Sequence, residues 1–425
     1  MIYFYRLALS GIMLVSAGFA AQPDVGQSTA PTTGFAVATY GGVIYVAGET
    51  SGHLGTTKSY GGHDAFVVAY DQNGNQLWIN QFGTSEEDRA LAVAVDSTGI
   101  YAAGLTYGAF PGFTLLGNDD AMIVKMDFNG NMLWIQQFGT PQLDRITGLT
   151  TDGTYVYAVG VTNGALPGQK NYGGDDAFVQ QYTQSGQLVY TKQGGSTGDD
   201  RAYGCFYFSP DVYITGRTDG VLPGQTSIGG LDAFFGSMTP AGTIKWDHQF
   251  GTTADDRGWA VVADSTGEYI TGRTEGVFPG QIAYGDDDAY IVKYDNKGNQ
   301  IWVNQFGTVD FDRGTGIASD STGVYTTGVT DGTLAGQVNF GSRDCYVNKY
   351  DVNGNPLWTV QFGSDDFDAS WGVATDPTGV YAAGTASGQL PGQDVTAGGF
   401  LIKYDQNGNL LWTIEFAPPA SSVKH

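Results

Sequence analysis

Short apolar runs separated by tight polar turns recur along almost the whole chain. Four such runs lie between Asp64 and Thr106, and a step of 56 residues carries Asp64 onto Asp120 and onward to Asp344. Each run ends at Gly, Asn or Asp, which is typical of strands joined by hairpin turns. No window shows the i, i+3, i+4 apolar spacing of an amphipathic helix. The pattern therefore predicts an all-β repeat protein.

Aromatic positions give the number of copies. Trp78 recurs as Trp or Tyr in every copy, with a shorter last step of 54 residues. Seven copies therefore fill residues 34–417. The step is kept without a slip by Tyr45, Tyr101, Tyr157, Tyr213, Tyr269, Tyr325 and Tyr381.

Each copy contains four predicted strands. Their apolar residues are nearly continuous rather than alternating, as expected for strands covered on both faces. Four-stranded sheets stacked radially meet that condition, so we predict a seven-bladed β-propeller with four antiparallel strands per blade. In the first two copies, the strands expected are Ala65–Tyr70, Gln76–Phe82, Leu91–Val95 and Ile100–Gly104.

The phase of the repeat predicts how the ring closes. The first copy begins with a first-type strand, Phe35–Thr39, and the last copy ends with a fourth-type strand, Leu410–Phe416. We expect every blade to be contiguous in sequence, with the first blade packing against the last. The alternative is one blade shared between both termini. In either phase, the loops after the second and fourth strands lie on one face, here called the loop face.

The recurring motif resembles the SBBP (seven-bladed β-propeller) repeat family. The motif is DAF at Asp64, DQNGN at Asp71, LW at Leu77 and QFG at Gln81, and it covers all seven copies. The resemblance implies a secreted propeller of the kind found in bacterial and archaeal surface proteins, with no agreed activity and no catalytic residues. The chain departs from the motif at Thr183, Tyr190, Gly194, Thr239, Ala369 and Gly398.

The N-terminus has the pattern of a secretion signal. Arg6 precedes the apolar stretch Leu7–Ala20, which is too short to span a bilayer and ends in small residues. We therefore predict a signal peptide over residues 1–21, a flexible lead-in over 22–33 and a tail over 418–425. The mature protein would be secreted, periplasmic or on the cell surface, and we predict no transmembrane segment.

Charge and cysteine content narrow the class of partner. The net charge of −24, from 43 acidic and 19 basic residues, disfavours nucleic acid and anionic membranes. Cys205 and Cys345 sit at different repeat positions, and we interpret both as buried thiols rather than a disulfide.

The acidic residues suggest one candidate metal site. Asp286, Asp287 and Asp288 stand in a row on the predicted loop face, beside Asp255 and Asp256 of the preceding loop. Hard divalent cations prefer such oxygen ligands, so Ca²⁺ could bind there. The alternative is that water and arginine side chains already satisfy these carboxylates. No other cofactor is predicted.

Most of the basic residues in the inter-blade loops occupy one position, the Arg of an Asp-Arg pair. Arg holds carboxylates through two parallel hydrogen bonds, so a tie between blades is one interpretation, and a ligand-binding ring on the loop face is the other. The candidate residues are Asp88, Arg89, Asp144, Arg145, Asp200, Arg201, Asp256, Arg257, Asp312 and Arg313.

Two classes of function remain open on these observations. The first is a secreted, non-enzymatic, monomeric propeller that binds a protein or glycan, or acts as a scaffold, at the cell surface or outside the cell. The alternative is a hydrolase or lyase with a site at the channel mouth. An enzyme should carry unique polar residues on one or two loops, whereas these copies are nearly uniform, which disfavours catalysis. The LW motif of the repeat also faintly resembles that of quinone-dependent dehydrogenases, but those propellers have eight blades.

Overall fold

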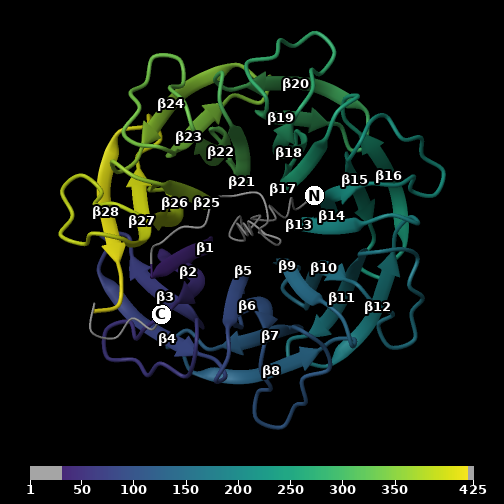
Figure 1. Cartoon of the computed structure of the whole chain (residues 1–425), viewed down its shortest axis with the longest axis vertical. Coiled ribbons are helices and arrows are strands. Elements are labelled where there is room, and N and C mark those ends of the chain that lie inside the picture. The colour runs from purple at the N-terminus through teal and green to yellow at the C-terminus, as the bar shows by residue number, and fades with distance from the viewer. Residues whose placement is uncertain (1–30, 420–425) are drawn as a thin grey trace, which may run out of the picture.

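The innermost strands of seven sheets lie around one axis (Figure 1). The computed structural model describes residues 31–419, so the predicted signal peptide and most of the predicted lead-in and tail lie outside the described residues. Each sheet has four antiparallel strands taken in sequence order. The fold is the predicted seven-bladed β-propeller.

The strands of the first four blades are as follows. Blade 1 has β1 (Thr32–Tyr40), β2 (Val43–Thr50), β3 (Asp64–Asp71) and β4 (Gln76–Phe82). Blade 2 has β5 (Asp88–Asp96), β6 (Gly99–Thr106), β7 (Asp120–Met126) and β8 (Met132–Phe138). Blade 3 has β9 (Asp144–Thr151), β10 (Tyr155–Thr162), β11 (Asp176–Thr183) and β12 (Leu188–Gly194). Blade 4 has β13 (Asp200–Phe208), β14 (Asp211–Thr218), β15 (Asp232–Met238) and β16 (Ile244–Phe250).

The last three blades continue the pattern. Blade 5 has β17 (Asp256–Asp264), β18 (Gly267–Thr274), β19 (Asp288–Tyr294) and β20 (Gln300–Phe306). Blade 6 has β21 (Asp312–Asp320), β22 (Gly323–Thr330), β23 (Asp344–Tyr350) and β24 (Pro356–Phe362). Blade 7 has β25 (Asp368–Asp376), β26 (Gly379–Ala386), β27 (Gly398–Tyr404) and β28 (Leu410–Phe416).

The ring closes in the contiguous phase. Blade 1 is one continuous segment, β1 to β4, and its β1 contacts β25, β26 and β27 of blade 7. The first strand begins at Thr32 rather than at the expected Phe35. The extra residues pair with the end of β2, where the Thr32 and Thr50 hydroxyls lie 3.0 Å apart. Within the described range, no helix is long and apolar enough to cross a membrane.

A β-bulge in the innermost strand of each blade aims one side chain at the axis. The register shifts by one residue at the same repeat position, for example between Ala90 and Ala92 in β5. Bulges redirect a side chain in this way. The facing residue of the second strand is glycine, because a Cβ at Gly104 would lie 1.9 Å from the carbonyl oxygen of Arg89. The seven bulge residues are Phe35, Leu91, Thr147, Tyr203, Trp259, Thr315 and Trp371.

The aromatic and aliphatic members of this set fill the centre of the ring. Phe35, Leu91, Tyr203, Trp259 and Trp371 belong to five different blades yet form one buried apolar cluster. Only side chains near the axis can meet from five blades. Tyr203 and Trp259 stack with ring centroids 4.4 Å apart. The channel is therefore plugged by side chains rather than open along its length.

The outer strands join neighbouring blades through the tight turns. Trp358 on β24 and Lys349 on β23 both donate to the carbonyl of Gln406 in the next blade, at 3.1 Å and 3.0 Å. That carbonyl belongs to the D-x-N-G-N turn, in which Asp405 accepts from the amides of Asn407 and Asn409. The repeated Trp therefore contacts the next blade, and the turn residues satisfy their own backbone. Cys205 and Cys345 are buried and form no disulfide in the described structure, as predicted.

Candidate functional site

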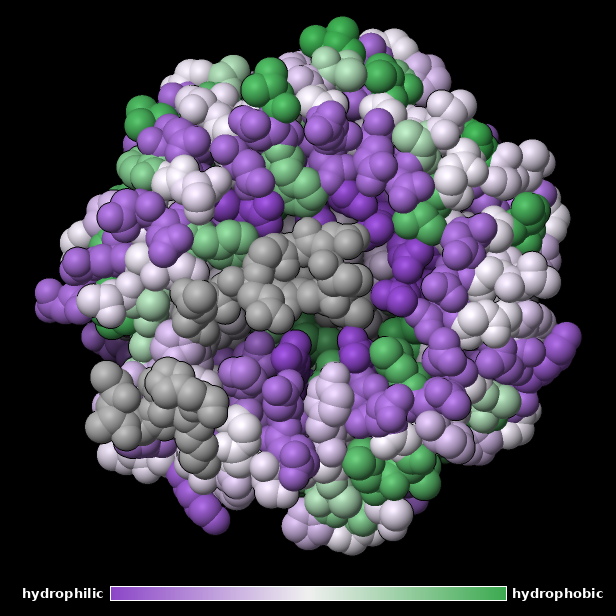
Figure 2. All heavy atoms as spheres, in the orientation of Figure 1, coloured by the Kyte–Doolittle hydropathy of each residue, from purple (hydrophilic) through white to green (hydrophobic). Residues whose placement is uncertain are grey.

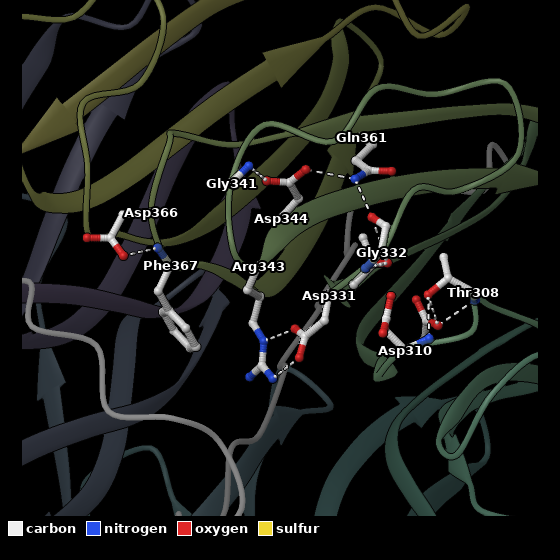
Figure 3. A network of polar contacts seen from close by, with 12 residues as sticks. Thr308, Asp310, Asp331, Gly332, Gly341, Arg343, Asp344, Gln361, Asp366 and Phe367 are labelled. Carbon is white, nitrogen blue, oxygen red and sulfur yellow. Dashed lines mark hydrogen bonds and ion pairs between the residues drawn. The ribbon is translucent and has the colours of Figure 1, made fainter.

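The Asp that opens the third strand of a blade organises the loop above it. In blade 6, the Asp344 carboxylate accepts from Gln361 Nε2 at 2.7 Å (Figure 3). It also accepts from the amide of Phe340 at 2.8 Å. Gln361 also donates to the carbonyl of Gly332 and accepts from the amide of Leu334. The same side chains make the equivalent contacts in blades 1 to 5. These buried carboxylates stabilise the loops.

The Asp of each Asp-Arg pair is also bound to the backbone of its own loop. Asp312 accepts from the amide and hydroxyl of Thr308 at 2.5 Å and 2.9 Å, and its residue is fully buried. Burial, with a smaller contribution from neighbouring Asp288, raises the pKa of Asp312 to about 7. Asp88, Asp144, Asp200 and Asp256 make the same pair of bonds with a Thr or Ser four residues earlier.

In three of the five Asp-Arg pairs, the Arg side chain binds a carboxylate of the preceding blade. Arg145 Nε on β9 lies 2.5 Å from Asp119 Oδ2, which precedes β7 of blade 2. Arg201 on β13 contacts Asp175 Oδ2 through both Nε, at 2.6 Å, and Nη2, at 2.5 Å. Arg89 Nε lies 2.9 Å from Glu49 Oε2 of blade 1. The partner is thus a carboxylate of the preceding blade, not the adjacent Asp.

Blades 5 and 6 depart from this arrangement. The acid expected opposite Arg257 is replaced by Leu231. The acid expected opposite Arg313 is Asp287, but Arg273 on β18 donates to its Oδ2 instead. Arg273 also lies 3.2 Å from Glu275. Arg343, just before β23, donates through Nε and Nη2 to Asp331 (Figure 3).

These substitutions gather three guanidinium groups around one aromatic ring. The Cζ atoms of Arg313 and Arg343 each lie 4.8 Å from the ring centroid of Phe311, and that of Arg273 lies 6.0 Å from it. We call Arg273, Phe311, Arg313 and Arg343 the arginine cluster. It lies on the loop face, because its members stand at the start of a first strand, the end of a second strand and the start of a third. On the face drawn in Figure 2, hydrophilic residues surround the centre.

Only one arginine of this cluster, Arg313, belongs to the repeated Asp-Arg pairs. Arg273 and Arg343 occupy repeat positions that hold other residues in most copies; the counterparts of Arg273 include Leu105, Val161 and Val329. Comparing the seven copies position by position, for charged residues that depart from the repeat, would have found Arg273 and Arg343. The repeated motif does not include them.

The three aspartates predicted as a metal site have separate environments. Asp287 bonds Arg273, and Asp288 accepts from Gln305 at 2.7 Å and from the amide of Tyr284 at 2.9 Å. Asp286 is exposed. Among residues 31–419, no group of three or more His, Cys, Asp or Glu residues is placed to hold a metal ion.

Two hollows lie on the surface of the described structure. One, of about 500 Å³, is lined by Tyr40, Trp78 and Phe128, and the Tyr40 and Phe128 rings stack at 5.7 Å. It lies beside the tight turns, away from the loop face. The other, of about 450 Å³, is lined by polar residues that include Asp310 and Asp331, and thus adjoins the ion pair of Arg343.

The arrangement as a whole is that of a seven-bladed β-propeller whose loop face differs locally in blades 5 and 6. No family model matches the chain. Regulatory protein FlaEY of Caulobacter vibrioides is 25% identical over 269 residues, covering 54% of this chain and 28% of that protein. An uncharacterised WD repeat-containing protein of Acanthamoeba polyphaga mimivirus is 21% identical and covers 83% of this chain and 29% of that protein. The chain spans less than a third of either relative.

Solved structures resemble the chain only distantly. The β-propeller domain of the Trilobed protease from Pyrococcus furiosus has 13% identity and a TM-score of 0.47, covering 91% of this chain and 99% of that one. A putative 6-phosphogluconolactonase from Bacteroides fragilis has 12% identity and the same TM-score of 0.47, covering 93% and 98% of the two chains.

Proposed function

We propose that the protein is a secreted, non-enzymatic propeller of the SBBP repeat kind that binds a protein or glycan through its loop face. The observation that carries this proposal is the arginine cluster. It is a local, charged departure from an otherwise regular ring, whereas the repeated carboxylates are engaged in hydrogen bonds that stabilise loops. Repeat proteins commonly bind through such broad faces.

Export rests on the sequence of residues 1–21, with its basic start, short apolar stretch and small residues at the end. A secreted binding module would act at the cell surface or outside the cell. We expect the mature chain to start near Gln22 and to be a monomer. N-terminal sequencing of protein from the medium or periplasm tests the export part of the proposal, and an intact Met1 in the cytoplasm would contradict it.

Binding is tested with the mature chain on a glycan array and in pull-downs from extracellular material. We expect saturable binding to a restricted set of ligands that weakens when residues of the arginine cluster are replaced. The alternative, a hydrolase or lyase at the channel mouth, predicts turnover of the bound glycan. Product formation would favour that alternative, and an absence of both binding and turnover would contradict the binding proposal.

A further inference from the structure

Arg313 is the most enclosed charged residue of the arginine cluster. Its exposed fraction is 1%, and it ranks among the largest fully buried side chains. Its guanidinium lies over two aromatic rings, at 5.0 Å from Trp259 and 4.8 Å from Phe311. Burying a charge without a hydrogen-bonded partner is costly, so such a group calls for an explanation.

The Nε and Nη2 atoms of Arg313 have no hydrogen-bond partner in the described structure. These two atoms form one edge of the guanidinium. At the equivalent position in blade 4, the same edge of Arg201 holds Asp175 Oδ2 at 2.6 Å and 2.5 Å. At the equivalent position in blade 3, Arg145 holds Asp119 through Nε. The position is thus built to hold a carboxylate.

The carboxylate that Arg313 should hold is engaged by another arginine. Asp287 is the counterpart of Asp175, but its Oδ2 accepts from Arg273, which stands where the blade of Asp175 has Val161. Arg343 is held in turn by Asp331. Arg273 and Arg343 thus each hold a carboxylate, whereas the Nε–Nη2 edge of Arg313 holds none in the described structure.

The groups around Arg313 disfavour its charged form. Burial, followed by the charges of Arg273 and Arg257, lowers the pKa of Arg313 to about 9, against a weaker opposing effect of Asp287. The side chain is still protonated at neutral pH. Arg273 and Arg257 repel its positive charge, and an added anion would relieve that repulsion.

We propose that the Nε–Nη2 edge of Arg313 binds the carboxylate of a small acidic ligand, either a free carboxylic acid or a uronic acid residue of a glycan. The inference rests on the proposed binding function and names the chemistry that the loop face recognises. A carboxylate oxygen fits between Nε and Nη2 of a guanidinium, as Asp175 Oδ2 does at the equivalent Arg201, and a free carboxylate could present its second oxygen to the same fork. Local positive charge attracts such a ligand although the whole chain carries −24.

Access to Arg313 requires the Phe311 ring to move. Phe311 is half-buried and ends the loop that includes exposed Val309, whose exposed fraction is 79%. Rotation of one aromatic side chain on such a loop would uncover the guanidinium. The ligand would then lie beside the Arg313 guanidinium in place of the Phe311 ring. The face of the displaced ring could pack against the ligand.

The test measures melting temperature and calorimetric binding of the exported chain with D-galacturonate, acetate and D-galactose at one ionic strength. We expect galacturonate or acetate to raise the melting temperature and neutral galactose to leave it unchanged. In Arg313→Leu the response should disappear, and in Arg313→Lys it should weaken about tenfold or more, because Lys cannot form the two-pronged contact. A response to galacturonate but not to acetate would identify the ligand as a uronic acid residue of a glycan. Equal responses to galacturonate and acetate would identify it as a free carboxylic acid.

Arg201→Leu is the matched control, since it removes the equivalent side chain where a protein carboxylate is already bound. It should lower the melting temperature and keep the response to carboxylates. The inference is overturned if the wild-type chain shows no response, or if Arg313→Leu and Arg313→Lys, shown to be folded by circular dichroism, respond as the wild type does. Binding on the glycan array that survives Arg313→Leu would overturn this inference while leaving the proposed binding function intact.

Discussion

Trp412 of the last blade donates its indole N–H to the carbonyl of Gln72 in the first blade, at 3.1 Å. Lys403 Nζ donates to the same carbonyl, also at 3.1 Å. The contact repeats the one made at other blade boundaries, for example by Trp358 and Gln406. Here it has a further consequence, because the chain itself does not connect blade 7 to blade 1. Closure of the ring depends on non-covalent contacts alone.

Replacing Trp412 with Phe should therefore destabilise the ring. The variant keeps an aromatic ring but loses the hydrogen bond, which typically contributes about 1 kcal/mol. Thermal and urea unfolding would measure the change. Trp358→Phe is the control at a boundary that the chain does connect. We expect the Trp412 variant to lose at least as much stability; a larger loss in the control would show that closure does not depend on this bond.

The second prediction concerns the tie between blades 3 and 4. Arg201→Ala would leave the carboxylate of Asp175, whose exposed fraction is 4%, buried without its two-pronged partner. A buried pair broken on one side costs on the order of 1–3 kcal/mol. We expect a lower melting temperature and little change in ligand binding. Asp175→Asn in the same background should recover part of the loss, and an unchanged melting temperature with lost binding would instead indicate a ligand ring.

The fold could be predicted because the sequence contains seven copies of one four-stranded unit. Trp78 and its Trp or Tyr counterparts and the turn glycines recur in all seven copies, an Asp opens the third strand in six of them, and any single copy would suffice to suggest a blade. The starting phase followed from which strand types begin and end the array. Several strands extend up to three residues past the predicted bounds, as at Thr32 in β1 and Asp88 in β5, because the pairing continues beyond the apolar runs.

The arginine cluster could not be predicted in the same way. Arg273, Arg313 and Arg343 come from three strands of two blades, and they meet only because the ring brings the ends of those strands to one face. Which arginine takes Asp287 depends on side-chain geometry rather than spacing. The Asp-Arg motif suggested a tie between blades or a ligand-binding ring, but it could not name the partner, which for Arg145 is Asp119 of the preceding blade.

Calcium binding stays a prediction to be tested. A cation at residues 286–288 would have to compete with Arg273 for Asp287 and with Gln305 for Asp288. We therefore expect equal melting temperatures with calcium, magnesium and chelator at constant ionic strength, so that screening does not imitate binding. A calcium-specific rise that is lost in Asp286→Asn would support the metal hypothesis, because Asp286 is the exposed member of the three.

Buried carboxylates should make the fold more stable at mildly acidic pH. Burial raises the pKa of Asp88 and Asp256 to about 6, and that of Asp368 to about 7. These folded-state pKa values exceed the unfolded value near 4, so between those limits the folded chain binds more protons. Stability should then fall as the pH rises from about 4 to 7. Melting temperatures across this range test the sign, and a monotonic increase with pH would contradict it.

The seventh blade offers a separate test at a single residue. In the other six blades a Gln on the fourth strand and an Asp on the third are hydrogen-bonded, whereas blade 7 has Glu415 and Gly398 at these two repeat positions. Glu415 accepts from the amide of Leu390 at 3.3 Å, as the glutamines do. When ionised, it cannot donate to the loop carbonyl that receives the glutamine Nε2 elsewhere, such as that of Gly332. Burial raises the pKa of Glu415 to about 7.

Glu415→Gln should therefore stabilise the protein at pH 8 and have little effect at pH 5, where Glu415 is protonated. The gain should be on the order of 1 kcal/mol, or a rise of roughly 2 °C in the melting temperature of a chain this large. The matched control is Gln361→Glu in blade 6, which puts a carboxylate where Gln361 Nε2 now lies 2.7 Å from Asp344. That change should lower the melting temperature at pH 8, because two buried carboxylates would repel each other. A loss of stability in Glu415→Gln at pH 8 would mean that the carboxylate of blade 7 has a favourable partner in solution.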